Sequence, residues 1–368
     1  MNKPLIASAV LFTLSSGNAL AADPKTEIER LKDRLEQLEK AQDEQAKANA
    51  LASEWNKYIT VSGVVEVEAG HADPFIGDSE SDIVLATAEL GVTAIVHPWV
   101  AADIVFLYEE DETDLEVDVA TVTIANPDGS WHLLAGKQYL PFGNYETSAI
   151  SDPLTLEIGE ILESAVLIGV ENSGFHIAGY VFNGDLDEDG DNQIDSFGAT
   201  AGYRFENDNN AFTANVGYIN SIGDADALSD TLPSSEVQEY VAGIAFNATY
   251  SFSDFTLIGE YVSATDNFAA DEIAFNGKGA EPSAWNLEVD YAFAIANMGA
   301  VAALAYQGTD EAVALELPES RIVAALSLGI FDNTALAFEY AYDTDYDESD
   351  GGTGENASTI TVQLAYEF

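Results

Sequence analysis

Apolar and polar side chains alternate in short segments from Tyr58 to the end of the chain. In residues 360–368, apolar or aromatic side chains occupy every second position, beginning at Ile360 and ending at Phe368. A period of two residues is typical of a β-strand with two unlike faces, whereas an amphipathic helix repeats every 3.6 residues. Sixteen such segments are predicted: 58–69, 82–96, 99–109, 114–125, 130–139, 164–171, 173–183, 196–206, 211–220, 237–252, 254–264, 283–296, 299–307, 320–331, 333–343 and 357–368.

The connections between these segments alternate between short and long. Residues 97–98, 172 and 297–298 are tight turns, whereas the connections at 70–81, 184–195 and 221–236 are long and rich in Asp, Glu, Gly and Ser. Short turns at one end, long loops at the other and an even number of strands are typical of transmembrane β-barrels, which must close because lipid cannot satisfy an open strand edge. The sequence therefore predicts an all-β fold, a 16-stranded antiparallel transmembrane β-barrel spanning residues 58–368.

The two faces of the predicted strands differ in the way that a lipid wall and a wet lumen require. The apolar positions predicted to face outward include Leu336, Phe338, Tyr340 and Tyr342, then Trp285, Leu287, Val289, Tyr291, Phe293 and Ile295, and then Tyr240, Ala242, Ile244 and Phe246. A terminal aromatic residue on such a strand predicts recognition by barrel-assembly machinery. The apolar side chains of 360–368 are thus interpreted as the lipid face of the closing strand.

The N-terminal residues belong to other elements. Lys3, an apolar run and the Ala19-Leu20-Ala21 site predict a secretory signal peptide at 1–21. Residues 22–57 form a periplasmic segment with heptad spacing at Ile28, Leu31, Leu35 and Leu38, which predicts a short helical, coiled-coil-like element. The apolar stretch 291–306 is too short for a membrane-spanning helix, and the chain contains no cysteine.

The net charge of the chain limits the classes of molecule that it can bind. The formal net charge is -53, and four of the 12 Lys and Arg residues follow Tyr58. Such a surface repels nucleic acid and attracts cations, although acidic surfaces also suit a salty habitat. By alternation, many acids face the lumen together with the scarce basic residues. The predicted pore- or substrate-lining residues on the strands are Lys137, Arg204, Arg321, Glu288, Asp290 and Glu339.

The connection 140–163 mixes apolar and acidic residues, unlike a solvated external loop. Ser151-Asp152-Pro153 predicts the start of a short helix, with Pro at its first position. We expect this loop to fold into the barrel and narrow the pore, which would bring Glu146, Asp152, Glu157 and Glu160 near the axis. The alternative is a helix packed at the external rim.

A further acidic loop, 185–195, partly matches a Ca²⁺-binding loop. Its candidate ligands are Asp185, Asp187, Asp189, Asp191 and Asp195, with a turn at Gly190. Ser196 replaces the bidentate Glu, and flanking helices are not predicted. This Ca²⁺ site is the one cofactor that the sequence suggests.

An enzyme is not predicted. The four histidines, His71, His97, His132 and His176, are scattered over turns and strands without a shared spacing. No serine lies in a nucleophile motif of the kind that hydrolases require.

Several segments resemble the LbtU-type siderophore porin family: 62–91, 107–118, "GKQYLPFGNYETSAISDPLTLEIGE" at 136–160, and 180–195. The resemblance spans essentially the whole mature chain, and 136–160 is its most distinctive part. It implies an outer-membrane barrel in siderophore-mediated iron acquisition, without the plug domain of energy-coupled receptors. Many ferric siderophores are anionic, and a pore this acidic should disfavour them unless Lys137, Arg204 and Arg321 cluster.

The sequence thus predicts a bacterial outer-membrane porin that passes a small hydrophilic solute, namely a siderophore or ferric siderophore, by diffusion. A general cation-preferring porin and a barrel-anchored tether to the cell wall are the alternatives. The expected partners are the solute, outer-membrane lipid and barrel-assembly machinery, and the heptad segment suggests either a homotrimer or contact with the cell wall.

Overall fold

The computed structural model describes Lys40, residues 57–188 and residues 193–368. The predicted signal peptide (1–21) and almost all of the predicted heptad segment (22–57) lie outside these residues, so both stay predictions. Residues Tyr58–Phe368 form one compact unit, which is the subject of the following description.

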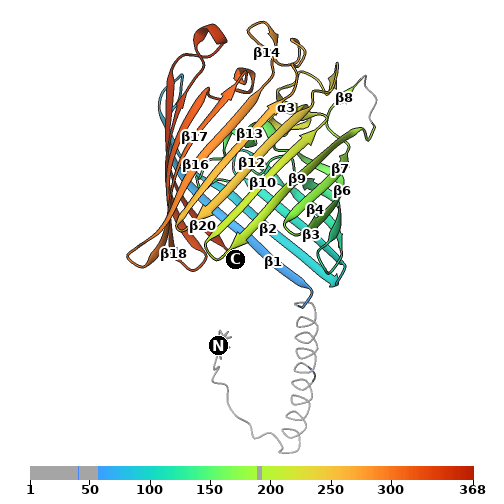
Figure 1. Ribbon diagram of the computed structural model, residues 1–368. Helices are drawn as coiled ribbons and strands as arrows, with labels where there is room; N and C mark the ends of the chain where they lie inside the picture. Colours follow the sequence, from blue (N-terminus) through green and yellow to red (C-terminus); the bar gives the residue numbers. More distant parts are fainter. Residues whose placement is uncertain (1–39, 41–56, 189–192) are drawn as a thin grey trace, which may run out of the picture. The chain divides into compact units, whose positions relative to one another are not determined.

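Sixteen antiparallel strands form a closed barrel, as the alternating pattern predicts (Figure 1). In barrel order they are β1 (Ile59–Asp73), β2 (Glu80–His97), β3 (Val100–Glu109), β4 (Thr113–Ala125), β5 (Trp131–Tyr139), β6 (Leu162–Asn172), β7 (Phe175–Phe182), β9 (Ser196–Asn207), β10 (Asn210–Ile219), β12 (Gly243–Phe252), β13 (Phe255–Ala264), β16 (Ser283–Ile295), β17 (Met298–Asp310), β18 (Ser320–Phe331), β19 (Thr334–Thr344) and β20 (Asn356–Glu367).

The first and last strands close the barrel. They pair over ten residues, from Val64 opposite Glu367 to Asp73 opposite Ser358. Beyond the last paired residue, Phe368 exchanges two backbone hydrogen bonds with Gly63, at 3.0 and 3.1 Å. The aromatic ring of Phe368 occupies the space that a Cβ on Gly63 would need. The C-terminal aromatic residue therefore caps the closing seam.

The strand boundaries lie within four residues of the predicted segments except before β12. The alternation suggested a strand from residue 237, but the barrel strand begins at Gly243. Tyr240 was predicted to face lipid and instead lies in the preceding loop, where its hydroxyl donates to the Leu186 carbonyl (3.1 Å) and to Asp195 Oδ1 (3.2 Å). The prediction for Tyr240 was wrong because the two-residue period continues by chance into a loop that packs on its neighbour.

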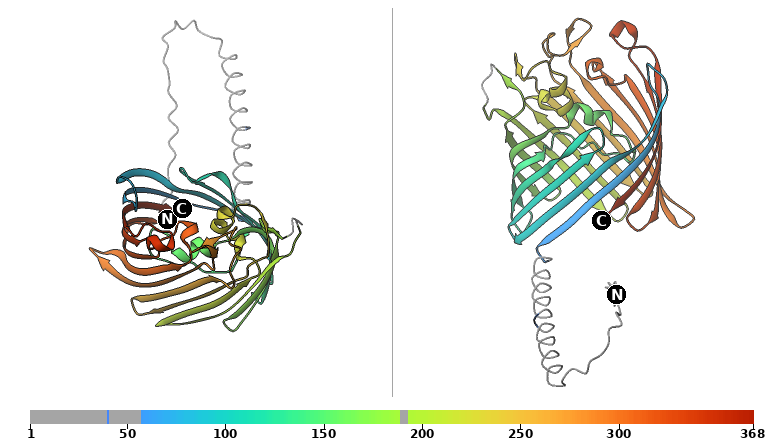
Figure 2. Two further views of the ribbon diagram at one scale, coloured as in Figure 1. Left: turned by 90° about the horizontal axis from the view of Figure 1, so that it is seen from above. Right: turned by 180° about the vertical axis from the view of Figure 1, so that it is seen from behind.

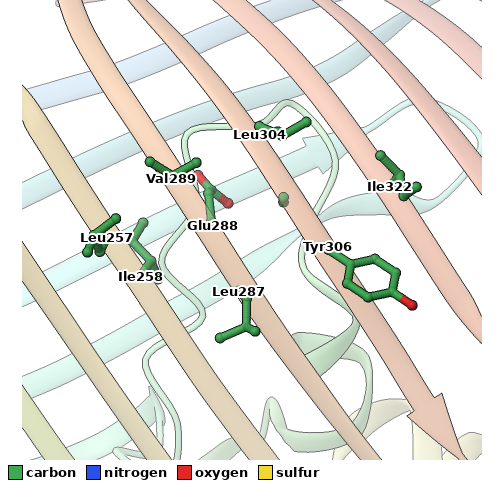
Figure 3. Close-up of a pocket in the computed structure, with 9 residues that line it drawn as sticks. Leu257, Ile258, Leu287, Glu288, Val289, Leu304, Tyr306 and Ile322 are labelled. Carbon is green, nitrogen blue, oxygen red and sulfur yellow. The ribbon is translucent and has the colours of Figure 1, made fainter.

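The outer wall of the barrel is apolar. Leu287 and Val289 on β16 are exposed there, while Glu288 between them turns to the interior. Figure 3 shows this outer face, where a shallow hollow of about 570 Å³ lies over β13, β16, β17 and β18. Its exposed apolar lining residues are Leu257, Leu287, Val289, Leu304, Tyr306 and Ile322.

The long loops contain short helices and strands. They are α2 (Leu154–Gly159), β8 (Asp187–Glu188), η1 (Ile222–Asp224), α3 (Asp226–Thr231), β11 (Glu236–Val237), β14 (Ala274–Phe275), β15 (Lys278–Gly279), η2 (Val313–Leu315) and η3 (Glu348–Asp350). Seen from above in Figure 2, the green and yellow helical turns lie within the ring of strands. Within the described residues, no helix is long and apolar enough to cross a bilayer.

Candidate pore constriction

The loop of residues 140–161 lies inside the barrel, against the wall formed by β13 and β16–β19. Its apolar residues explain part of this position, because Leu154, Ile158 and Ile161 are buried in a core with Phe142. Wall and loop residues share this core, which also includes Ile222, Leu228 and Val262. Burial of these side chains holds the base of the loop and removes one side of the lumen from the solvent path.

Carboxylates on the inner wall hold the loop through its backbone. On β13, Glu260 accepts hydrogen bonds from the amides of Asn144 (2.7 Å) and Tyr145 (3.0 Å). The Thr155 hydroxyl donates to the same carboxylate at 2.9 Å, so Glu260 joins the start of the loop to the first turn of α2.

The next contacts are made by β16. Glu288 accepts from the Ser148 amide (2.6 Å) and from the Thr147 hydroxyl (2.7 Å). Asp290, two residues further along the strand, accepts from the Ser148 hydroxyl at 2.9 Å. These three hydrogen bonds to two neighbouring carboxyl groups fix the middle of the loop.

The tip of the loop is held by β17 and β19. Gln307 accepts from the Leu154 amide at 3.1 Å. Glu339 accepts from the amides of both Ile150 and Ser151, the latter at 3.2 Å. Together with Glu260 and Glu288, these residues form a row of acceptors that follows the loop across the wall.

Small side chains on the wall leave room for the loop. Ala305, Val323 and Ala341 form a buried patch on β17, β18 and β19, and Ala149 of the loop packs on it. On β10, two strands from β13 in the barrel, a side chain on Gly217 would collide with the Phe142 carbonyl. The loop can therefore lie flat on the wall.

On the remaining side, an acidic cavity of about 440 Å³ lies between the loop tip and strands β1, β2, β19 and β20. Seven carboxylates line it, and no Lys or Arg is among its described lining residues: Glu66, Glu68, Glu109, Glu110, Glu112, Asp152 and Glu339. Asp152 belongs to the loop and Glu339 to β19 beneath the loop tip, whereas the other five belong to β1, the end of β3 and the connection that follows it. Carboxylates of both the loop and the wall thus line the cavity.

The predicted site residues on the strands divide into two groups. Glu288, Asp290 and Glu339 all face the interior, but each is about 95% buried beneath the loop. The three basic residues lie on β5, β9 and β18, which are not neighbours in the barrel. The structure therefore does not bring Lys137, Arg204 and Arg321 together.

Two of these basic residues are paired with acids. Arg321 makes two hydrogen bonds to Asp343, at 2.8 and 3.0 Å. Lys137 donates to Glu116 at 3.5 Å and to the Val117 carbonyl at 3.1 Å. Both cations are thus largely compensated.

The surroundings of three loop carboxyl groups raise their pKa values. Desolvation raises the pKa of Asp152, and the nearby Glu109, Glu112 and Glu339 raise it further. Desolvation likewise raises the pKa of Glu157, with Asp152 adding to the shift and Arg321 opposing it. Desolvation and the charge of Asp226 raise the pKa of Glu160 to about 7.

The remaining predicted loop residue, Glu146, is exposed. Its carboxylate accepts from the Thr249 hydroxyl on β12 at 2.7 Å. The short helix begins at Leu154, with Pro153 at the preceding capping position rather than the first helical one.

The Ca²⁺ hypothesis stays a prediction, because Asp189 and Asp191 lie outside the described residues. Of the other candidates, Asp187 belongs to β8, which pairs with β11, and Asp195 accepts from Tyr240. In the described part of the chain, no group of three or more His, Asp or Glu side chains is placed to hold a metal.

Sequence reasoning missed Glu260, Gln307 and Asn286 as residues beneath the loop. Alternation shows that they face inward, but it does not show what covers them. A row of inward alanines on β17–β19 is the signal that could have located the loop.

No family model matches the chain. It is similar to a UPF0422 protein of Legionella pneumophila strain Lens, with 28% identity over 359 residues. A UPF0422 protein of Coxiella burnetii is 24% identical over 316 residues. These matches cover 84% and 83% of this chain, and 66% and 68% of the two relatives. The chain therefore spans about two thirds of the length of the curated relatives it matches.

Solved structures resemble the barrel at low sequence identity. An anion-selective porin from Comamonas acidovorans has a TM-score of 0.61 and 14% identity, and the outer-membrane channel DcaP of Acinetobacter baumannii has 0.59 and 15%. Vibrio cholerae OmpT, in its trimer form, has 0.52 and 14%. Each match covers 84% of this chain and 97–99% of the other. The chain therefore has the fold of bacterial outer-membrane porins.

Proposed function

We propose that this protein is an outer-membrane porin through which small hydrophilic solutes diffuse, with a preference for cations. The observation that carries the proposal is the cavity between the loop tip and β1, β2, β19 and β20, which is lined by carboxylates of both the loop and the wall. Such carboxylates lower the energy of a cation that has shed part of its hydration and raise the energy of an anion. The porin fold supports a channel rather than an enzyme.

The placement of the basic residues supports this selectivity. An anion would need a cationic side chain at the cavity, but Lys137 and Arg321 are each paired with an acid elsewhere on the wall. Anion selectivity is a property named for the Comamonas porin, and it does not transfer to this chain at 14% identity.

The proposal can be tested with proteoliposomes that contain the purified protein. Swelling rates would be compared for an organic amine, a neutral polyol and a carboxylic acid of similar size. We expect the amine to enter fastest and the acid slowest. Equal rates, or faster entry of the acid, would contradict cation preference, whereas no swelling with any solute would contradict a channel.

The narrower hypothesis of siderophore transport rests on the resemblance of residues 136–160 and the other quoted segments. The acidic cavity favours a cationic or neutral siderophore over an anionic ferric complex. A deletion strain grown on defined iron sources, complemented with the wild-type protein or with Lys137→Ala, tests this hypothesis. The hypothesis would be refuted if growth on every siderophore tested were the same with and without the protein.

We further propose insertion in outer-membrane lipid, with residues 22–57 in the periplasm and a homotrimer as the assembly. The exposed apolar wall supports lipid contact, and the aromatic cap at Phe368 supports recognition by barrel-assembly machinery. The trimer form of OmpT supports the oligomer. The cell-wall tether is the competing role for 22–57: deletion of these residues should leave conductance intact, and loss of envelope attachment would favour the tether.

A further inference from the structure

The contact between the loop and the wall contains buried polar atoms without a protein partner. Both side-chain amide atoms of Asn286 are partnerless, as is Nε2 of Gln307, and both residues have 0% of their surface exposed. The two residues are opposite each other on β16 and β17. They therefore place a cluster of unsatisfied donors and one acceptor at a single point beneath α2.

Other unsatisfied atoms follow the same contact. Oδ1 of Asp290, the hydroxyl of Ser151 and the hydroxyl of Tyr145 are buried without a partner. Asp290 lies on β16 and contacts the loop, while Ser151 and Tyr145 belong to the loop itself. The unsatisfied atoms thus lie along the surface where the loop meets the wall.

Burying so many polar groups without hydrogen-bond partners destabilises the folded state. A buried amide or hydroxyl without a hydrogen bond loses its hydration and gains nothing in return. Buried water in proteins typically makes about three hydrogen bonds to such groups. Asn286 supplies both a donor and an acceptor, and Gln307 adds a donor, which is enough to hold one water molecule.

We propose that the loop rests on enclosed water, with a principal water site bridging the side chains of Asn286 and Gln307. The loop is then held in two ways: by direct backbone hydrogen bonds to Glu260, Glu288 and Glu339, and by water between these points. The inference concerns the seating of the loop and does not depend on which solute passes.

The direct test is a structure of the wild-type barrel at a resolution that reveals ordered water. We expect a density peak about 2.7–3.2 Å from polar atoms of both amides. The proposal is overturned if the two amides bond directly to each other or to the loop. It is also overturned if the site holds a cation, recognised by oxygen ligands alone, or shows no peak.

A second test uses Asn286→Leu, which replaces the amide with an apolar side chain of similar size. If the amide is hydrated, its loss breaks the bridge and lowers the unfolding temperature of the folded barrel. If the amide is dry, removal of an unsatisfied group raises that temperature, which would overturn the proposal.

Asn247→Leu is the matched control, because Asn247 also lies on the inner wall but accepts directly from Asn215 at 2.6 Å. It measures the cost of placing a leucine on the wall at a site with a protein partner. The density test uses the unmodified chain and stays decisive even if the leucine variants do not assemble.

Discussion

The attachment of the loop tip to Glu339 should control the width of the channel. The carboxylate of Glu339 accepts the amides of Ile150 and Ser151, and both lie at the edge of the acidic cavity. Glu339→Ala removes both acceptors. We therefore expect the tip to leave the wall more often, with larger and noisier single-channel currents in planar bilayers.

The magnitude follows from the two hydrogen bonds. Each bond to a charged group contributes about 1.5–3 kcal/mol, and since the two share one carboxylate, we take about 2–4 kcal/mol for the pair. At about 1.4 kcal/mol per factor of ten, the population with a displaced tip should rise roughly 30- to 1,000-fold. The base of the loop stays held by Glu260 and Glu288, so the barrel itself should remain folded.

Two controls separate attachment from charge. Glu68→Gln removes one carboxylate from the same cavity without touching the loop, so it should alter ion selectivity but not current noise. Glu339→Gln keeps the acceptor oxygen and should fall between the wild-type protein and Glu339→Ala. Unchanged conductance and noise in Glu339→Ala would refute the role of this residue in holding the tip.

Further predictions concern charge, pH and assembly. Glu66→Gln combined with Glu68→Gln should lower the cation-to-anion permeability ratio, measured from zero-current potentials. The pKa of Glu160 is raised to about 7 from an ordinary 4.5, so the folded barrel favours the protonated carboxyl. The contribution of Glu160 to the free energy of unfolding is therefore full below pH 4.5 and is lost as the pH rises through 7. Glu160→Gln should remove this part of the pH dependence, measured from unfolding temperatures between about pH 4.5 and 8. Gly136→Ala should block folding, monitored by heat-modifiable gel mobility, because its φ is +138° and a Cβ would meet a carbonyl of β4. Deletion of Phe368 should reduce barrel yield in the membrane fraction, since it removes two hydrogen bonds of the closing seam.

The barrel could be predicted from the sequence because strand alternation is local. Residues 360–368 or 333–343 show their two faces without reference to any other part of the chain. The failure at Tyr240 marks the limit of this reasoning, because a two-residue period in a loop looks the same as one in a strand. What distinguishes Tyr240 is a hydrogen bond to Leu186, 54 residues away.

The site was harder to predict because its contacts join distant residues. Alternation places Glu288 and Glu339 inside the barrel, where they suggest free charges in the lumen. Their partners in the loop lie 140 and 189 residues away, and those partners turn the carboxylates into anchors. The acids left at the cavity, such as Glu66 and Glu68, differ from the anchors in location and not in local sequence. The apolar residues of 140–163 did indicate that this loop is not solvated.

The central claim is that the carboxylates lining the cavity select for cations. The zero-current potential of the purified protein in a planar bilayer, measured across a potassium chloride gradient, tests this claim most directly. A potential whose sign shows that potassium permeates better than chloride is the predicted result. A potential of the opposite sign would contradict the account.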